Sequence, residues 1–209
     1  IADGDTGYGG LLNVAHAVRG YEAAGASAIQ LEDQVFPKKC GHTPNRRVIP
    51  AEDMVRKIRV AAESRTSKDF LIVARTDART EHGIDEALRR AELYGKAGAD
   101  ILFVESPESE DEMRTICERV DKPLLANMVE GGRTPVKSRE VLQQLGYRIA
   151  IFPVTALLAA TEAMAAAYAT LKAQGSSAGI AQPLYPFRDM STLMGFQEVW
   201  DFEKKYAED

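Results

Sequence analysis

The sequence has few cysteines and no excess of basic residues. Only two of its 209 residues are cysteine, Cys40 and Cys117, which is too few for a disulfide framework and lacks the paired spacing of a zinc site. Lysine and arginine number 26 against 31 aspartates and glutamates, so the basic footprint of a nucleic-acid binder is missing. These absences favour a reducing, cytoplasmic compartment and a small-molecule ligand, with no nucleic acid as partner.

Long hydrophobic runs are also missing. No apolar stretch approaches the roughly 20 residues that cross a bilayer, and no signal peptide is visible. We therefore expect no membrane partner. The hydrophobic content of 45% nevertheless suffices for one full core, so a folded chain is expected.

Strand and helix patterns alternate six times along the chain. Short apolar runs have the composition of strands covered on both faces, and apolar residues recur at helical spacing between them. Such alternation predicts a parallel sheet with right-handed crossovers. The expected strands are 1–3, 26–31, 70–74, 101–104, 124–126 and 148–152, and the expected helices are 11–24, 51–64, 85–97, 108–119, 138–145, 155–172 and 190–206.

One internal repeat favours a barrel over an open sheet. Segments 24–32 and 97–105 share a design of helix end, glycine, short link, strand and acidic terminus. Equivalent units around an axis predict an α/β fold, a (β/α)8 TIM barrel, whose strand ends would meet on one rim. A doubly wound sheet would gather only those near its switch point. The polar strand ends are Asp3, Glu32, Arg75, Glu105 and Asn127.

Six strands are fewer than the eight of a complete barrel. We therefore expect the N-terminal strands of the barrel to be absent from this sequence, and a chain of these residues alone to be inactive. The barrel is assigned to residues 1–173, and a linker with a C-terminal helical extension to 174–209. Helix 155–172 is alanine-rich and apolar almost all round, which predicts burial against another subunit, with an internal lid as the alternative.

Two aspartates after the first strand form a candidate metal site. Asp3 and Asp5 flank one residue beside glycines, and hard carboxylate oxygens suit Mg²⁺ or Mn²⁺. Glu32, at the neighbouring strand end, can join through a water. The alternative is that Asp5 makes an ordinary Asx-turn or caps a helix.

The segment around Cys40 gathers a thiol, an imidazole and two ammonium groups. Positive charge from Lys38, Lys39 and His42 favours the thiolate, so we expect a lowered pKa for this thiol. The alternative is a small buried hydrophobe, the common state of free cysteines and the one we assign to Cys117.

Guanidinium and amide groups on the same rim suit a substrate with more than one carboxylate. Arg75 ends a buried strand and can bind a carboxylate through two hydrogen bonds, although an ion pair with Asp77 or Glu105 is the structural alternative. The segment 127–135 adds further donors on a glycine-containing loop.

Five motifs in this order resemble the isocitrate lyase and phosphoenolpyruvate mutase superfamily. They are Asp3-Gly4-Asp5-Thr6-Gly7-Tyr8-Gly9, Glu32-Asp33-Gln34, Lys38-Lys39-Cys40-Gly41-His42, Ala74-Arg75-Thr76-Asp77-Ala78 and Val104-Glu105-Ser106. The resemblance runs through Pro153. It implies a homotetrameric (β/α)8 barrel in which the alanine-rich helix is exchanged between subunits.

The resemblance also implies a chemistry. Mg²⁺ would be held with Asp3, Asp5 and Glu32, and the bond between C2 and C3 of a 2-hydroxy di- or tricarboxylate would be cleaved into a 2-oxo acid and a carboxylate. Cys40 matches the cysteine that protonates the departing carbanion, with His42 and Lys39 beside it. The matching substrate-binding positions are Tyr8, Arg75, Glu105, Asn127 and Glu130.

The segment Glu130-Gly131-Gly132-Arg133-Thr134-Pro135 resembles the branch of 2-methylisocitrate lyase, dimethylmalate lyase and the petal death protein rather than isocitrate lyase itself. Substrates of the 2-methylisocitrate or 2,3-dimethylmalate type are therefore expected. Alternatives are a phosphonate mutase-like or oxaloacetate-processing enzyme of the same superfamily, and a truncated barrel that acts only in binding or assembly.

Overall fold

A computed structural model describes residues 1–43 and 45–207, which fall into two units, Ile1–Thr155 and Ala156–Asp209. The last two residues of the expected extension, Glu208 and Asp209, lie outside the described residues. The first unit ends at the first residue of the alanine-rich helix, which the sequence-based boundary at residue 173 assigns to the barrel. That assignment stays a prediction.

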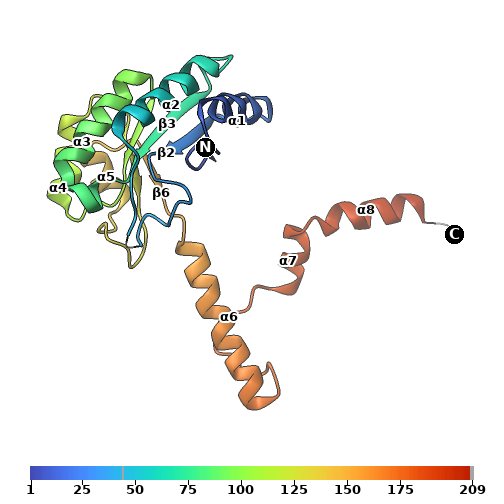
Figure 1. Ribbon diagram of the computed structural model, residues 1–209. Helices are drawn as coiled ribbons and strands as arrows, with labels where there is room; N and C mark the ends of the chain where they lie inside the picture. Colours follow the sequence, from blue (N-terminus) through green and yellow to red (C-terminus); the bar gives the residue numbers. More distant parts are fainter. Residues whose placement is uncertain (44, 208–209) are drawn as a thin grey trace. The chain divides into compact units, whose positions relative to one another are not determined.

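Parallel strands in chain order form the frame of the first unit (Figure 1). Four of them make one sheet in the order β1-β2-β3-β4, and β5 pairs with β6. A parallel bridge between Leu102 and Leu124 makes the two sheets neighbours. The α/β class with a parallel sheet is confirmed, while barrel closure stays a prediction. The bounds are Ala2–Asp3, Ala28–Glu32, Leu71–Thr76, Ile101–Val104, Leu125–Asn127 and Ile149–Ile151 for β1 to β6.

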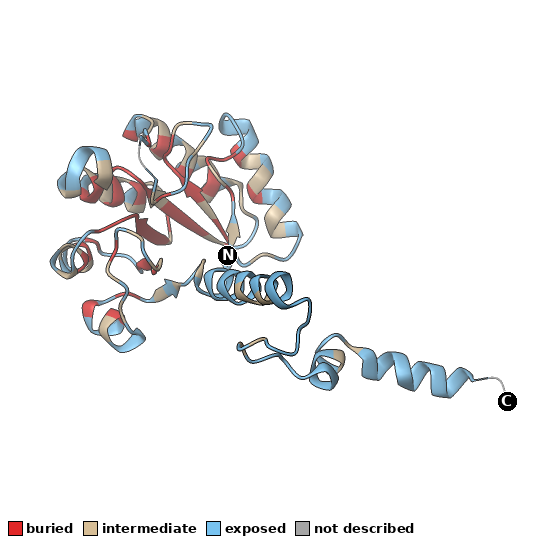
Figure 2. Cartoon of the chain, turned by 90° about the horizontal axis from the view of Figure 1, so that it is seen from below, coloured by how far each residue is buried: buried red, intermediate tan, exposed pale blue. Residues whose placement is uncertain are grey.

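Five helices contribute to the main core of this unit. Each carries apolar side chains at helical spacing, and these pack with the strand residues that face them, such as Ile29, Ile72 and Leu102. Figure 2 shows the buried residues concentrated in the strands and in the inner faces of these helices. The helices are α1 (Leu11–Ala23), α2 (Ala51–Ser64), α3 (Arg79–Ala97), α4 (Glu110–Arg119) and α5 (Arg139–Leu145).

Strand alternation separates the two faces of the sheet. Because successive side chains point to opposite faces, the residues that alternate with the helix-packed ones share the other face. A second, smaller apolar cluster lies there, built from Ala28, Val73, Ile101, Phe103 and Leu125. The polar residues at the strand ends are an even number of positions from the residues of this cluster. They therefore share its face, at the carboxyl edge of the strands.

The helix bounds follow local signals, with one correction. Ser109 and Ser138 cap α4 and α5 by accepting hydrogen bonds from the amides of Glu112 and Val141. We expected Asp85 to begin the third helix, but α3 begins at Arg79. Its first turn is separated from the rest by a non-helical Gly83 with φ of 82°.

The second unit contains helices but no strand among its described residues. It consists of α6 (Thr155–Gln174), most of which lies in this unit, α7 (Phe187–Leu193) and α8 (Phe196–Tyr206). The prediction of one helix over 190–206 is wrong, because Gly195, with φ of 82°, separates two helices. None of the three contains a buried residue. Within the described ranges, no helix is long and apolar enough to cross a membrane.

Candidate active site

Three carboxylates meet around one cation at the carboxyl edge of β1 and β2. The Nζ atom of Lys38 lies 2.5 Å from Asp5 Oδ1, 3.3 Å from Asp3 Oδ2 and 3.6 Å from Glu32 Oε2. The amide of Asp5 donates to Asp3 Oδ1, so the side chain that makes the turn interaction is that of Asp3, whereas the alternative interpretation assigned it to Asp5. The structure thus brings together the three residues predicted to hold a metal, with an ammonium between them.

Burial and neighbouring charges shift the pKa of Lys38 and of Glu32 in this cluster. Burial lowers the pKa of Lys38, but the hydrogen bond with Asp5 and the charges of Glu32 and Asp3 outweigh it and raise the pKa to about 12. Burial raises the pKa of Glu32 to about 7, while Arg75 and Lys38 oppose that shift. The carboxylate of Glu32 is 1% exposed, and neither oxygen has a hydrogen-bond partner among the described residues.

This arrangement fits a hard divalent cation. The chain places one positive charge where three carboxylate oxygens converge, and Glu32 retains oxygens with no hydrogen bond. Oxygen ligands of this kind suit Mg²⁺ or Mn²⁺, which keep several waters or substrate oxygens in their shell. Among residues 1–43 and 45–207, no three acidic, histidine or cysteine side chains enclose an ion by themselves. Added ligands, such as water or substrate, would have to complete the shell.

Arg75 is the centre of a second cluster, on the neighbouring strand β3. Its Nε and Nη2 atoms donate to Asp77 at 2.9 Å each, and Nη2 lies 3.2 Å from Glu105 Oε2. The guanidinium also lies over the ring of Phe103, 5.1 Å from its centroid. Burial lowers the pKa of Arg75, but Asp77, Glu105 and Glu32 raise it above its ordinary value. Both ion pairs that were the structural alternative are therefore present.

His42 lies on the Glu105 side of this cluster. Its Nδ1 accepts from the amide of Arg133 at 3.3 Å, and its Nε2 lies 3.4 Å from Asn127 Nδ2 and 3.7 Å from Glu105 Oε1. Asn127 donates to Glu105 Oε2 at 3.2 Å, and its own Oδ1 is buried without a partner in the described part of the chain. His42, Glu105 and Asn127 thus form one group.

The segment with Cys40 lies directly over Arg75 and Glu105. The Gly41 carbonyl accepts from the Ser106 hydroxyl at 3.0 Å, and a Cβ atom on Gly41 would come within 2.5 Å of Arg75 Nη2 and 2.8 Å of Glu105 Oε2. Only glycine fits this close approach. The position of Gly41 therefore sets how near its neighbours, Cys40 and His42, come to the rim.

Cys40 is exposed, and the cations expected to surround its thiol are engaged elsewhere. Lys38 faces the carboxylates, and Lys39 donates to the Asn45 carbonyl at 3.2 Å. Of the two adjacent lysines, the sequence-based assignment chose Lys39 for catalysis, whereas Lys38 is the one at the acidic cluster. Residue spacing alone does not distinguish the two.

Two further predicted substrate-binding residues have partners of their own. The Tyr8 hydroxyl lies 2.8 Å from that of Tyr21 and donates to the Asp3 carbonyl at 3.1 Å. The hydrogen bond with Tyr21 is the main cause that raises the pKa of Tyr8 to about 12. Glu130 accepts from the Thr155 hydroxyl at 2.5 Å. Among the contacts of the described residues, none places Glu130 in either cluster.

Buried polar residues that were not among the predicted site residues support the rim. Asp33, fully buried, accepts from the Tyr94 hydroxyl at 2.7 Å, from Arg90 at 3.1 Å and from the amide of Asp77 at 2.9 Å. Asp77 in turn holds Arg75 and a buried Arg46. An acidic residue next to a strand end was the only sequence signal for Asp33, because its partners are 43 to 61 positions away.

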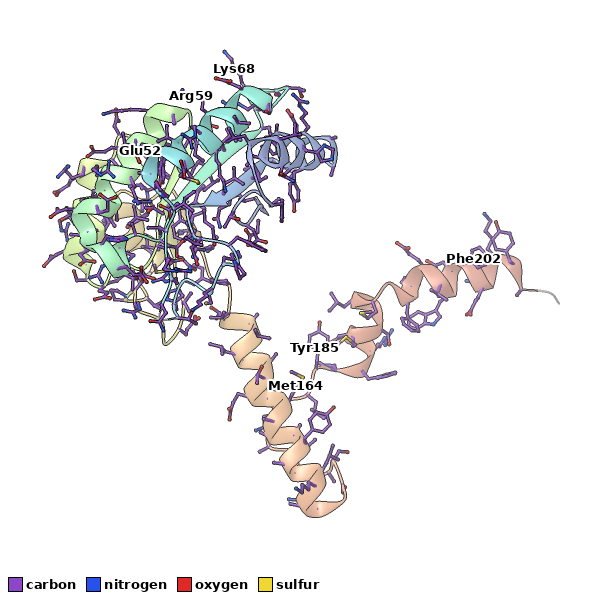
Figure 3. All side chains as sticks on the ribbon, viewed as in Figure 1. Glu52, Arg59, Lys68, Met164, Tyr185 and Phe202 are labelled. Carbon is purple, nitrogen blue, oxygen red and sulfur yellow. The ribbon has the colours of Figure 1, made fainter. Side chains whose placement is uncertain are left out.

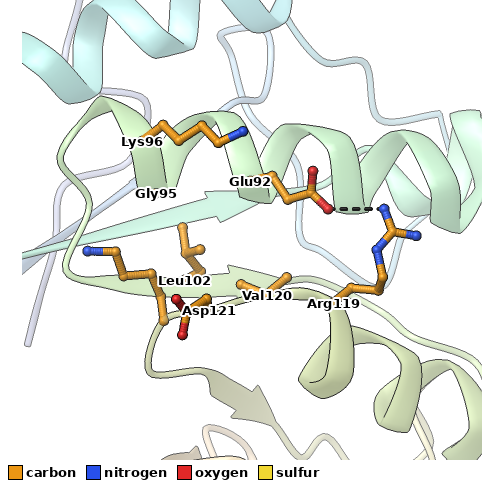
Figure 4. Close-up of a pocket in the computed structure, with 8 residues that line it drawn as sticks. Glu92, Gly95, Lys96, Leu102, Arg119, Val120 and Asp121 are labelled. Carbon is orange, nitrogen blue, oxygen red and sulfur yellow. Dashed lines mark hydrogen bonds and ion pairs between the residues drawn. The ribbon is translucent and has the colours of Figure 1, made fainter.

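A cavity of about 440 Å³ lies away from these clusters, where β4 begins rather than where it ends (Figure 4). Leu102 and Val120 line it, and the ion pair between Arg119 and Glu92, with atoms 3.0 Å apart, borders it. None of the predicted site residues lines this cavity. The candidate site is therefore the rim.

Comparison with known proteins identifies the family. Residues 1–172 match the sequence profile of phosphoenolpyruvate phosphomutase. The chain is 49% identical to 2,3-dimethylmalate lyase of Eubacterium barkeri, 46% to 2-methylisocitrate lyase of Aeropyrum pernix and 39% to the petal death protein of Dianthus caryophyllus. These matches cover 99%, 100% and 99% of the chain but span 72%, 66% and 65% of the three relatives.

Solved structures give the same result. A crystal structure of 2,3-dimethylmalate lyase superposes with a TM-score of 0.87 at 35% identity over 99% of this chain and 69% of that one. Phosphonopyruvate hydrolase in complex with oxalate and Mg²⁺ superposes with a TM-score of 0.81 at 28% identity over 99% and 72%. The expected enzyme class, a carbon-carbon lyase, agrees with the names of the lyases among these relatives. The chain belongs to the phosphoenolpyruvate mutase and isocitrate lyase superfamily.

Proposed function

We propose that the protein is a Mg²⁺-dependent lyase that cleaves the bond between C2 and C3 of a 2-hydroxy di- or tricarboxylate, of the 2,3-dimethylmalate or 2-methylisocitrate type. The observation that carries this proposal is the pair of neighbouring clusters on one rim. One holds the Lys38 ammonium between Asp3, Asp5 and Glu32, and the other holds Arg75 against Glu105. The lyase names of two relatives at 46% and 49% identity support it.

The two clusters divide the recognition of the substrate between them. Asp3, Asp5 and Glu32 would hold Mg²⁺, which when bound supplies positive charge for the 2-hydroxyl and its carboxylate. Arg75 is fixed by Asp77 through Nε and Nη2, and its Nη1 lies 3.5 Å from Glu32 Oε2, so a second carboxylate of the substrate would approach Nη1 in competition with Glu32. A substrate with two carboxylates fits this division.

The reaction then needs two proton transfers. A base removes the proton of the 2-hydroxyl, the C2–C3 bond breaks, and its electron pair stays on C3 as an enolate while C2 becomes the carbonyl of a 2-oxo acid. The Sγ–H of Cys40 gives its proton to C3, so no water is consumed. C3 accepts this proton because it has just gained negative charge. The exposed thiol of Cys40 is the donor in this proposal.

The enolate of a carboxylate is high in energy, so fixed positive groups must be present before it forms. The Arg75 guanidinium is held by three carboxylates in a largely buried place, and Nε2 of His42 lies 3.7 Å from Oε1 of one of them, Glu105. Both groups are in position without rearrangement. His42 and Arg75 are therefore assigned to charge stabilisation, and Cys40 to protonation.

A second candidate activity is the processing of phosphonopyruvate or oxaloacetate. The match of residues 1–172 to the phosphoenolpyruvate phosphomutase profile supports keeping it. Pro135 argues mildly against oxaloacetate hydrolysis, because the hydrolases of the superfamily are expected to carry a serine there. Turnover of either compound in place of the substituted malates would favour this candidate.

The test is a substrate panel on the full-length protein. Purified protein with Mg²⁺ is incubated with 2,3-dimethylmalate, 2-methylisocitrate, oxaloacetate and phosphonopyruvate, and 2-oxo acid formation is followed. We expect cleavage of at least one substituted malate and its loss with excess chelator. A Cys40→Ser variant is expected to lose at least about 100-fold in kcat, because the thiol is the proton donor.

Cys117→Ser is the matched control, because this thiol lies on α4, and it should keep the wild-type rate. Absence of cleavage across the malates would sink the lyase proposal. Full activity of Cys40→Ser would remove the role assigned to that thiol alone.

A further inference from the structure

The segment that carries Cys40 is tied to the rest of the unit at its base. We define the Cys40 loop as residues 35–43 and 45–47. Its two ends are joined by an antiparallel bridge between Gln34 and Val48, and the amide of Val35 donates to the Arg47 carbonyl at 2.7 Å. The amide of Ile49 donates to the Asp33 carbonyl at 2.8 Å. These bonds close the base but do not reach the tip.

Within the loop, packing is sparse. The Gln34 side chain pairs with the backbone of Lys39, donating to its carbonyl at 2.9 Å and accepting from its amide at 3.0 Å. A cavity of about 170 Å³ lies between the two limbs of the loop, and Phe36 is 71% exposed. Because apolar contacts are few, polar anchors must hold the loop in place.

Arg46 is the buried anchor of the second limb. Its side chain is 1% exposed, it donates through Nη1 to Asp77 Oδ1 at 2.8 Å, and it donates through Nη2 to the Thr80 hydroxyl. A guanidinium this deeply buried must be paired, because its desolvation is costly. Asp77 and Thr80 follow β3, so Arg46 ties the Cys40 loop to the strand that carries Arg75.

The carboxylate of Asp77 therefore serves two guanidinium groups. Oδ1 accepts from both Arg46 and Arg75, and Oδ2 accepts from Arg75. The amide of Asp77 is in turn fixed by Asp33. One buried carboxylate thus sets the direction of Arg75 and the position of the loop above it. The side chains of Arg46 and Asp77 link the Cys40 loop to Arg75.

We propose that Arg46 is a positioning residue, which holds the Cys40 loop over the rim by pairing with the carboxylate that also orients Arg75. Among the described residues, Arg46 meets the Arg75 cluster only through Asp77, so its effect passes through that carboxylate and the loop backbone. The kinetic part of this inference rests on the proposed lyase activity. The structural part does not.

The test compares Arg46→Met and Arg46→Lys with wild type by limited trypsin digestion, in which mass spectrometry follows cleavage after Lys38 and Lys39. Cleavage in this loop requires the loop to leave the rim. We expect Arg46→Met to be cut there at least about 10-fold faster, and Arg46→Lys to lie between, because lysine makes one contact where arginine makes two. Asp77 keeps Arg75 as partner in both variants, so no buried charge is left unpaired.

Arg65→Met is the matched control. Arg65 also forms a partly buried pair, with Asp100, but it lies at the opposite end of β3, and its removal should leave cleavage at Lys38 and Lys39 unchanged. If Arg46→Met fails to fold, Thr80→Val removes the second contact of Arg46 alone and should give a smaller increase of the same sign, about 2-fold or more. Cleavage within 2-fold of wild type in Arg46→Met, or an equal rise in Arg65→Met, overturns the proposal.

Kinetics provide the second readout. If the loop positions the proton donor, Arg46→Met lowers kcat at least about 10-fold and leaves KM within about 2-fold, with partial recovery in Arg46→Lys. A rise in KM at unchanged kcat would instead show that Arg46 acts on substrate binding, and would overturn the inference. If no lyase activity exists, the digestion result still decides whether Arg46 anchors the loop, so the two proposals fail separately.

Discussion

The two units of the chain differ in how far their apolar side chains are buried. In the first unit, Met54, Ile58 and Ile72 are fully buried, whereas in the second Leu157 is 62% and Phe202 63% exposed. Figure 2 shows the same contrast in colour, and Figure 3 shows Met164 and Phe202 projecting from α6 and α8 into solvent. The difference lies in what each helix has to pack against.

Helices α1 to α5 each have a strand of the same unit beside them, so their apolar faces are covered. Helix α6 is apolar almost all round, and α8 gathers Phe196, Val199 and Trp200 within five residues, yet neither buries a residue. Exposed apolar surface of this extent marks an interaction site in soluble proteins. Exchange of helices between subunits, which the sequence resemblance implies, stays a prediction, and it requires the kind of uncovered surface seen here.

The sharpest test of this contrast is the same substitution in both units. Leu88 on α3 is 1% exposed, and Leu157 on α6 is 62% exposed. We expect Leu88→Ala to lower the free energy of unfolding by about 3 kcal/mol, because it leaves a cavity in the core. Leu157→Ala should change it by less than about 0.5 kcal/mol in the monomer. Urea denaturation followed by far-ultraviolet circular dichroism measures both.

Protein concentration distinguishes an exposed helix from one that is covered in an assembly. If α6 packs against a second copy, Leu157→Ala becomes costly only at concentrations where the oligomer forms, and sedimentation velocity reports that oligomer. An equal, concentration-independent cost for the two variants would contradict the contrast between the units.

Strand positions and most helix bounds could be predicted because each signal is local. Apolar runs such as Ile101–Val104 end where a polar residue appears, and serines cap α4 and α5. The two errors involve glycine in the left-handed region. Gly195 separates two helices across which the apolar spacing continues, whereas Gly83 separates the rest of α3 from a first turn, residues 79–82, that has no apolar residue. Apolar spacing therefore revealed neither feature.

The rim could be predicted because the alternation of side chains between the two faces of a strand can also be read from local sequence. Asp3, Glu32 and Arg75 come at strand ends, and the structure places them together on one face, although their chemical roles stay predictions. What could not be predicted depends on contacts between distant residues. Lys38 and Lys39 are neighbours of identical chemistry, and only the folded loop decides which one meets the carboxylates.

The two cysteines show the same contrast between burial and exposure within the first unit. Burial raises the pKa of Cys117 to about 11, so its thiolate fraction at pH 8 is about 0.1%, whereas Cys40 is exposed. We expect iodoacetamide to modify Cys40 at least about 10-fold faster than Cys117 at pH 8. Peptide mass spectrometry of a time course measures both rates in one sample.

Unfolding the protein in urea is the internal control, because both thiols should then react at similar rates. If Cys117 reacts as fast as Cys40 in the native protein, α4 does not protect it, and the burial described for that helix would be contradicted.

The smallest expected effect concerns a surface carboxylate of the compact unit. Hydrogen bonds from Arg89, then from Arg90, lower the pKa of Glu86 from 4.5 to about 2. Because the folded pKa is the lower one, the stabilisation is present above pH 4.5 and is lost as pH falls toward 2. Glu86→Gln should therefore lower the free energy of unfolding by less than about 1 kcal/mol at pH 7, since solvent screens the pair, and the difference should shrink toward pH 3. A difference between Glu86→Gln and wild type that grows toward low pH would contradict the assignment, because only a raised pKa gives that sign.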